Sequence, residues 1–146
     1  MNKVTKALYR VAAVIFLLFA TGHTAGFLTF RPKSPEGLAV FESMRSVRFQ
    51  FGGSSGSWLG FYTGFGLFVS VYMIFSIFLA WRLSNTRPGE ISMARALAWV
   101  LFAVQLANVA VCAAYFGPVQ VAFAASCAAT IGFAALQTRP QLASAP

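Results

Sequence analysis

The sequence predicts an all-α membrane protein, a four-transmembrane-helix bundle with an amphipathic interfacial helix between the first and second spans. Four stretches without Asp, Glu, Lys or Arg support this prediction, because a helix of about 20 residues crosses a hydrocarbon core of about 30 Å. Composition agrees, since 58% of the 146 residues are hydrophobic, against about 45–50% in soluble domains. Lipid offers the backbone no hydrogen-bond partners, so these stretches must be helical. The expected spans are Val11–Phe30, Leu59–Trp81, Ala96–Tyr115 and Val119–Gln137.

Three cations, Lys3, Lys6 and Arg10, precede the first span. A cleaved signal peptide begins in the same way, but its apolar region is about 7–15 residues long and ends at a small-residue cleavage site. Here the apolar run continues to Phe30, and no clear A-x-A site follows it. We therefore expect a retained membrane anchor.

The first connection, residues 31–57, contains the signals of a surface helix. Ser34-Pro35-Glu36 supplies a capping serine, a proline for the first helical position and an acid for the first turn. Apolar residues then fall on one helical stripe, formed by Val40, Met44, Val47 and Phe51. We expect a helix that lies on the outer membrane surface or caps the bundle. The glycine- and serine-rich segment 52–57 is expected to be a flexible hinge.

The remaining connections are short. Residues 84–93 form a polar turn around Pro88-Gly89, and Gly117-Pro118 closes a hairpin between the last two spans. Residues 138–146 contain two prolines and little that could pack, so we expect a disordered tail. The sequence thus predicts a single membrane domain over residues 1–137.

The formal net charge of +8 is concentrated beside the spans. Cations in such places reach the headgroup region and are attracted to anionic lipid, whereas nucleic-acid binders carry a basic patch or stripe in water. We therefore expect membrane lipids, and not nucleic acid, as partners. With four spans, both termini and the second connection share one side, which carries seven of the 11 Lys and Arg residues. The positive-inside rule then predicts a multi-pass protein with both termini cytoplasmic.

The sequence lacks the residues that several kinds of chemistry require. No Asp or Glu lies in an expected span, which argues against a proton-coupled exporter. The single histidine excludes haem held by two histidines of one chain, and no C-x-x-C motif is present for thiol–disulfide catalysis. Cys112 and Cys127 are expected to be buried apolar thiols without metal-ligand spacing. We therefore expect no catalytic residue, cofactor or metal ion, and an enzyme is the less favoured interpretation.

Polar residues recur at similar depth in the outer half of the expected bundle. One interpretation is hydrogen bonding between helices, at about 0.6–2 kcal/mol for each contact. The other is a pocket for a lipid headgroup or quinone, with positive charge from the surface helix. For the two arginines the alternative is ordinary snorkelling beside phospholipid. The candidate lipid-binding residues are His23, Thr24, Arg45, Arg48, Tyr62 and Asn108.

Small residues at four-residue spacing predict close approach of helix backbones. In the second span they are Gly60 and Gly64, followed by Gly66, and in the fourth span the spacing recurs at Ala124, Ala128 and Gly132. Such a pattern either seals contacts within one chain or forms the face of a homo-oligomer.

Three segments of the chain, Gly22–Phe27 (GHTAGF), Met44–Val47 (MRSV) and Trp58–Gly66 (WLGFYTGFG), carry a family resemblance. With them, about the first 80 residues resemble a family of uncharacterised bacterial four-helix membrane proteins. DoxX-like proteins are similar in architecture only. Residues 42–46 resemble the E-R-x-x-R-A-x-x-N run of the membrane-associated eicosanoid and glutathione enzymes, but Ser43 and Ser46 replace its two arginines. The resemblance implies a fold and a membrane, and no reaction.

With that resemblance, the favoured interpretation is a non-catalytic accessory or lipid-interacting protein of a bacterial inner membrane. One alternative is a membrane-embedded redox or lipid-modifying protein that binds a quinone or lipid at the polar residues around His23. Another is an oligomeric unit for small-solute permeation, against which the missing acidic residues count.

Overall fold

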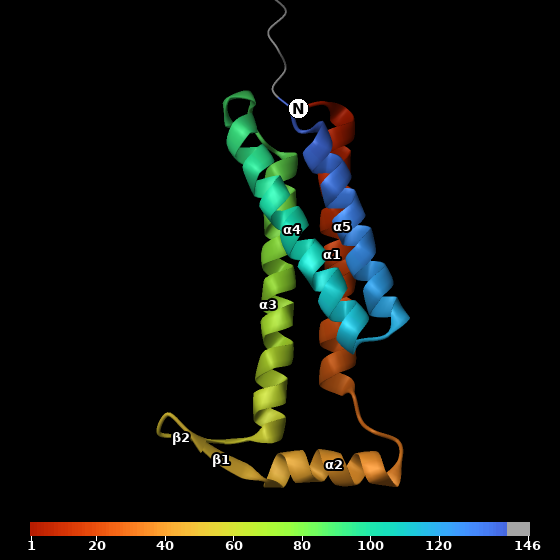
Figure 1. The fold of residues 1–146 in the computed structure, drawn as a ribbon, viewed down its shortest axis with the longest axis vertical. Coiled ribbons are helices and arrows are strands. Elements are labelled where there is room, and N and C mark those ends of the chain that lie inside the picture. Colours follow the sequence, from red (N-terminus) through yellow and green to blue (C-terminus); the bar gives the residue numbers. More distant parts are fainter. Residues whose placement is uncertain (140–146) are drawn as a thin grey trace, which may run out of the picture. The chain divides into compact units, whose positions relative to one another are not determined.

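The computed structural model describes residues 1–139 of the chain, and residues 140–146 lie outside the described part (Figure 1). The all-α class is confirmed, with a small β-hairpin added. In order, the elements are α1 (Lys3–Thr29), α2 (Pro35–Ser46), β1 (Arg48–Phe51), β2 (Ser54–Ser57), α3 (Trp58–Ser84), the short 3-10 helix η1 (Pro88–Glu90), α4 (Ile91–Tyr115) and α5 (Pro118–Gln137).

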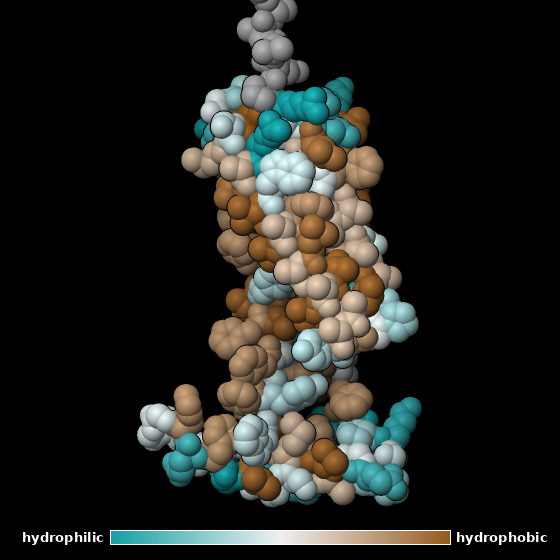
Figure 2. All heavy atoms as spheres, in the orientation of Figure 1, coloured by the Kyte–Doolittle hydropathy of each residue, from teal (hydrophilic) through white to brown (hydrophobic). Residues whose placement is uncertain are grey.

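Four helices are long and apolar enough to cross a membrane: α1, α3, α4 with η1 before it, and α5. The chain is therefore a multi-pass membrane protein. Large apolar side chains on these helices remain exposed, such as Phe68 at 70% and Phe78 at 64%, and Figure 2 shows brown, hydrophobic atoms over the helices on the face drawn. α1 begins at Lys3 instead of Val11, because lysine and arginine favour helix and extend it beyond the apolar run.

The chain divides into two compact units, described separately below. The bundle unit comprises residues 1–19 and 74–139, and the loop unit comprises residues 20–73. In the bundle unit, the beginning of α1 and the end of α3 contribute to one buried core with α4 and α5. That core consists of a few large side chains and many alanines; its members include Tyr9, Ala12, Phe16, Ala80, Ala98, Leu101, Ile131, Ala134 and Ala135.

Small residues bring α4 and α5 close together, as their spacing predicts. Ala124 and Ala128 on α5 are buried. A Cβ added to Gly132 would lie 2.7 Å from Cε2 of Phe102 on α4, closer than real carbon atoms approach. Cys112 and Cys127 are buried and free of disulfides, so both are the apolar thiols expected from the sequence.

The beginning of α1 and the end of α5 lie side by side in the bundle unit. Thr138 Oγ1 already donates to the Ala134 carbonyl (2.8 Å), so it accepts the hydroxyl proton of Tyr9, also at 2.8 Å. Thr5 Oγ1 donates to Asn2 Oδ1 at 2.8 Å and lies 3.4 Å from Gln137 Oε1. The expected disordered tail therefore begins with a buried, hydrogen-bonded Thr138, and its residues 140–146 lie outside the described range.

In the loop unit, α2 begins at the position that the sequence predicts. Ser34 caps it by accepting a hydrogen bond from the Gly37 amide at 3.1 Å, and Pro35 occupies the first turn. None of the residues of α2 is buried. Its apolar stripe is therefore left exposed, as befits a helix at a membrane surface.

The expected helical stripe through Phe51 and the flexible hinge at 52–57 are both wrong. α2 ends at Ser46, and β1 and β2 form an antiparallel hairpin that pairs Arg48 with Ser57. Gly52 and Gly53 have φ values of 56° and 79°, the left-handed conformation that a tight two-residue hairpin turn requires. The Gly-Gly pair therefore closes a turn, and it does not act as a linker.

Candidate functional site

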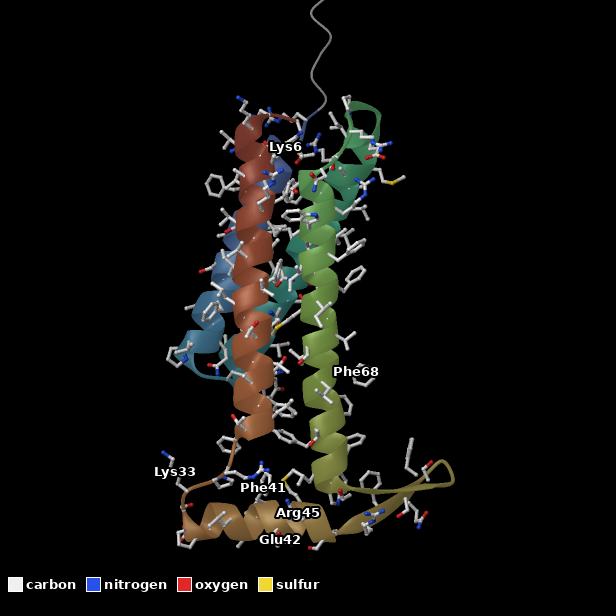
Figure 3. All side chains as sticks on the ribbon, turned by 180° about the vertical axis from the view of Figure 1, so that it is seen from behind. Lys6, Lys33, Phe41, Glu42, Arg45 and Phe68 are labelled. Atoms are coloured by element: carbon white, nitrogen blue, oxygen red, sulfur yellow. The ribbon has the colours of Figure 1, made fainter. Side chains whose placement is uncertain are left out.

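The loop unit contains a cavity of about 170 Å³ where α1 ends and α3 begins, with α2 along one side (Figure 3). Its lining is mainly apolar and aromatic, with two arginines and two hydroxyl groups. The lining residues are Phe27, Leu28, Phe30, Arg31, Phe41, Arg45, Leu59, Tyr62 and Thr63. They come from three helices and from the residues that follow α1.

Arg31 is held at the cavity by two contacts within the loop unit. Its guanidinium carbon lies 5.3 Å from the centroid of the Phe41 ring, within cation–π range. Its Nη1 donates to the carbonyl oxygen of Phe30 at 2.8 Å. A guanidinium has five N–H donors, so donors remain for an anion in the cavity.

Arg45 supplies the second positive charge from α2. It follows Phe41 by four residues, so the two side chains lie on one face of the helix. Both residues are labelled in Figure 3. Its partner Glu42 is 4.0 Å away, and the two side chains are 59% and 67% exposed. A pair this long and this exposed contributes little. Arg45 therefore keeps its positive charge available to a ligand.

An aromatic wall closes the inner side of the cavity. The Phe27 ring stacks on the His23 ring with centroids 5.7 Å apart, and it is tilted by 49° against the Tyr62 ring at 5.2 Å. The Phe27 ring also occupies the place that a Cβ on Gly66 would need. Gly66 is thus required for Phe27 to reach this position.

His23 and Thr24 connect α1 to α3 and do not line the cavity. The Gly66 carbonyl can only accept, so Nε2 of His23 is the donor in their 3.1 Å hydrogen bond. Thr24 Oγ1 and Ser70 Oγ are 2.8 Å apart. These contacts match the interhelical hydrogen-bonding interpretation of the polar residues.

The other four candidate residues lie in three different parts of the structure. Tyr62 and Arg45 line the cavity. Arg48 lies on β1, where its Nη2 is 3.4 Å from the Ser55 carbonyl across the hairpin. Asn108 belongs to the bundle unit, and its Oδ1 accepts from the Cys112 thiol at 3.9 Å.

Among the three candidate packing glycines of α3, only Gly66 meets another helix within the loop unit. A Cβ on Gly60 would meet Ser57 Oγ at 3.2 Å, and for Gly64 no atom of the described chain lies within 4 Å. A homo-oligomer built on Gly60 and Gly64 stays a prediction.

Sequence reasoning missed Arg31 and Phe41 as site residues. The available signal was the cation directly after the first span, followed by Phe41 and Arg45 at a four-residue spacing on the surface helix. These residues can be recognised as a site only when it is known that α2 folds back under the end of α1.

Two shallow, open apolar grooves lie in the loop unit. The first is lined by Met44, Trp58, Phe61, Tyr62 and Phe65 and so shares Tyr62 with the cavity. The second runs along α2 and shares Met44 and Trp58 with the first. The cationic cavity and the first apolar groove therefore have one lining residue in common, Tyr62.

The polar groups of the cavity can hold an anion, because arginine and tyrosine donate hydrogen bonds. Across residues 1–139, no three His, Cys, Asp or Glu side chains are grouped to hold a metal ion.

No protein-family model matches the chain, and neither a curated protein nor a solved structure is significantly similar to it.

Proposed function

We propose that this chain is a non-catalytic, lipid-interacting accessory protein of a bacterial inner membrane. The observation that carries the proposal is the cavity with Arg31 and Arg45, which shares its lining residue Tyr62 with an apolar groove. An anionic headgroup suits the first part and an acyl chain suits the second. The resemblance of the first 80 or so residues to bacterial four-helix membrane proteins supports the bacterial location.

Both termini are proposed to lie in the cytoplasm. The support is the distribution of Lys and Arg, of which seven of 11 flank the spans on the side of the termini. The loop unit would then face the outer side of the membrane. Reporter fusions after residue 87 and after residue 52 test this: activity of a cytoplasmic reporter at the first site only is expected, and the reverse pattern contradicts the proposal.

The two other functions have weaker support. A redox or lipid-modifying role at His23 requires the ring to reach a ligand, yet its Nε2 is bonded to Gly66 and its face is stacked on Phe27. A permeation unit requires a polar path, whereas the outward faces of the spans are apolar, as for Val71 at 62% exposure. Both remain outcomes of the experiment that follows.

Native mass spectrometry of the protein, extracted gently from bacterial membranes, tests the proposal beside the His23→Ala and Asn108→Ala variants. We expect co-purified phospholipid with the wild type and with both folded variants. A quinone held by the wild type and lost from folded His23→Ala would favour the redox function instead. Solute flux through the protein in liposomes, abolished by Gly64→Leu, would favour permeation.

A further inference from the structure

We infer that the Arg31–Arg45 cavity binds the phosphate of an anionic glycerophospholipid, with an acyl chain lying in the groove between Met44 and Phe65. This inference rests on the proposed lipid-interacting function and names the ligand class and the site. Three properties of the loop unit support it: charge, size and continuity.

The charge of the cavity selects an anion. Arg31 and Arg45 are the charged side chains in its described lining, and they come from different elements, so a phosphate between them would receive hydrogen bonds from two directions. Arginine is well suited to this task because its planar donors match two phosphate oxygens at once. A zwitterionic headgroup would bring a cation toward the same two arginines and would bind less well.

The size of the cavity limits it to part of a lipid. At about 170 Å³ it is smaller than the roughly 300–1,000 Å³ of pockets that enclose drug-sized ligands. It can hold a phosphate with a small substituent, and the remainder of the ligand must leave through an opening. A glycerol headgroup satisfies this limit better than a sugar or an inositol.

Continuity at Tyr62 provides the exit. Tyr62 lines both the cavity and the first groove, and it is half exposed. On the groove side the wall consists of Met44, Trp58 and aromatic rings, packed through Phe61 and Phe65 at 4.7 Å. Tyrosine and tryptophan concentrate where headgroups meet acyl chains. The site therefore changes from polar to apolar at Tyr62, as a phospholipid changes from its headgroup to its acyl chains.

The test measures lipid retention by native mass spectrometry of the full chain in detergent, offered equal amounts of phosphatidylglycerol and phosphatidylcholine with identical chains. The double variant R31Q/R45Q removes the two cavity charges. Its control, K33Q/R87Q, removes two exposed charges that do not line the cavity. We expect the wild type and the control to prefer phosphatidylglycerol about tenfold, and R31Q/R45Q to hold both lipids equally.

The single variant Arg45→Gln keeps the test valid if the double variant does not fold. Arg45 is exposed on a helix without buried residues, so its replacement costs at most about 0.5 kcal/mol of stability. We expect it to lose most of the preference while helicity and melting temperature stay unchanged. An unchanged preference in folded Arg45→Gln, or in folded R31Q/R45Q, overturns the site.

A second pair of variants tests the position of the acyl chain. Phe65→Ala shortens the groove wall, whereas Phe68→Ala removes a ring from the same helix at a position outside the groove. Phe65→Ala is expected to weaken retention of a long-chain phosphatidylglycerol about threefold, and Phe68→Ala to leave it unchanged. Equal losses in both variants overturn the groove assignment.

Two further outcomes separate this inference from the proposed function. If the wild type retains lipid but R31Q/R45Q retains phosphatidylglycerol equally well, the site fails and the lipid-interacting function stands. If the wild type retains no lipid at all, both fail. Displacement of phosphatidylglycerol by inorganic phosphate at constant ionic strength would identify a soluble anion as the ligand and overturn the lipid assignment.

Discussion

The bundle unit and the loop unit are stabilised by different kinds of contact. In the bundle unit, small side chains such as Ala98 and Ala134 are fully buried, and helix backbones approach closely. In the loop unit, α2 buries none of its residues, and the structure depends on ring stacking, one serine cap and hydrogen bonds between α1 and α3. The bundle unit also has a pocket, of about 260 Å³, where the end of α3, η1 and the start of α4 meet. The two pockets differ in charge: the bundle pocket pairs Arg82 with Glu90 at 3.2 Å, whereas the described lining of the loop-unit cavity has two arginines and no acid.

The largest effect is expected from breaking the close packing of the bundle unit. Gly132→Val would force its methyl groups into the Phe102 ring, at a cost of about 1–3 kcal/mol in the free energy of unfolding. Hydrogen exchange should then rise throughout α4 and α5. The control Gly22→Val adds the same atoms where no described atom lies within 4 Å of the new Cβ; an equal loss in both variants would contradict the proposed role of small residues.

A somewhat smaller effect is expected at the hairpin turn of the loop unit. Gly53 has a φ of 79°, and a side chain there costs about 1–2 kcal/mol. Gly53→Val should accelerate hydrogen exchange over residues 48–57 and leave α4 and α5 unchanged. Asparagine tolerates this conformation better, so Gly53→Asn should recover most of the protection. Loss without recovery would mean that the turn is not held by backbone conformation.

Gly66→Ala tests a glycine contact of the loop unit with a smaller change, one added methyl group in place of the three carbon atoms of Gly132→Val. The methyl group displaces the half-buried Phe27 ring, and because fewer atoms are added the cost should be about 1 kcal/mol. The variant should keep its fold and lose phosphatidylglycerol preference, since Phe27 forms the wall of the cavity. A large drop in melting temperature with unchanged lipid binding would reverse the roles that we assign to the two units.

The smallest effect is expected from His23→Ala. It removes one hydrogen bond between α1 and α3, and such bonds in membrane proteins are worth about 0.6 kcal/mol on average. Thr24 still pairs with Ser70 in this variant. Thermal unfolding of purified protein should therefore shift by a few degrees at most, and His23→Gln should restore part of the difference if its amide reaches the Gly66 carbonyl.

The spans and the start of α2 could be predicted because their signals are local. Apolar runs specify membrane helices in any context, and Ser34-Pro35 specifies a helix start with its own atoms. The hairpin could not be distinguished from a linker, because Gly52-Gly53 serves either purpose and the choice depends on Phe49 packing against Trp58, with centroids 4.8 Å apart. Such a contact is not visible in the sequence.

The cavity was predicted in part for the same reason. Arg45 and Tyr62 were recognisable as a cation on a surface helix and an aromatic residue near a span end. Arg31 was not, because its role depends on Phe41 lying beneath it. His23 was singled out as the only histidine. It donates a hydrogen bond to the Gly66 carbonyl of α3, and its role as a lipid-binding residue stays a prediction.

The hydrogen bond between Tyr9 and Thr138 has a consequence for biogenesis. Its partners are 129 residues apart in sequence, so the first helix enters the bilayer long before its partner has been synthesised. In the loop unit, the hydrogen bond between Thr24 and Ser70 spans 46 residues. Contacts with shorter loops form sooner. The contacts between α1 and α3 in the loop unit should therefore form while the ribosome is still translating the last two spans.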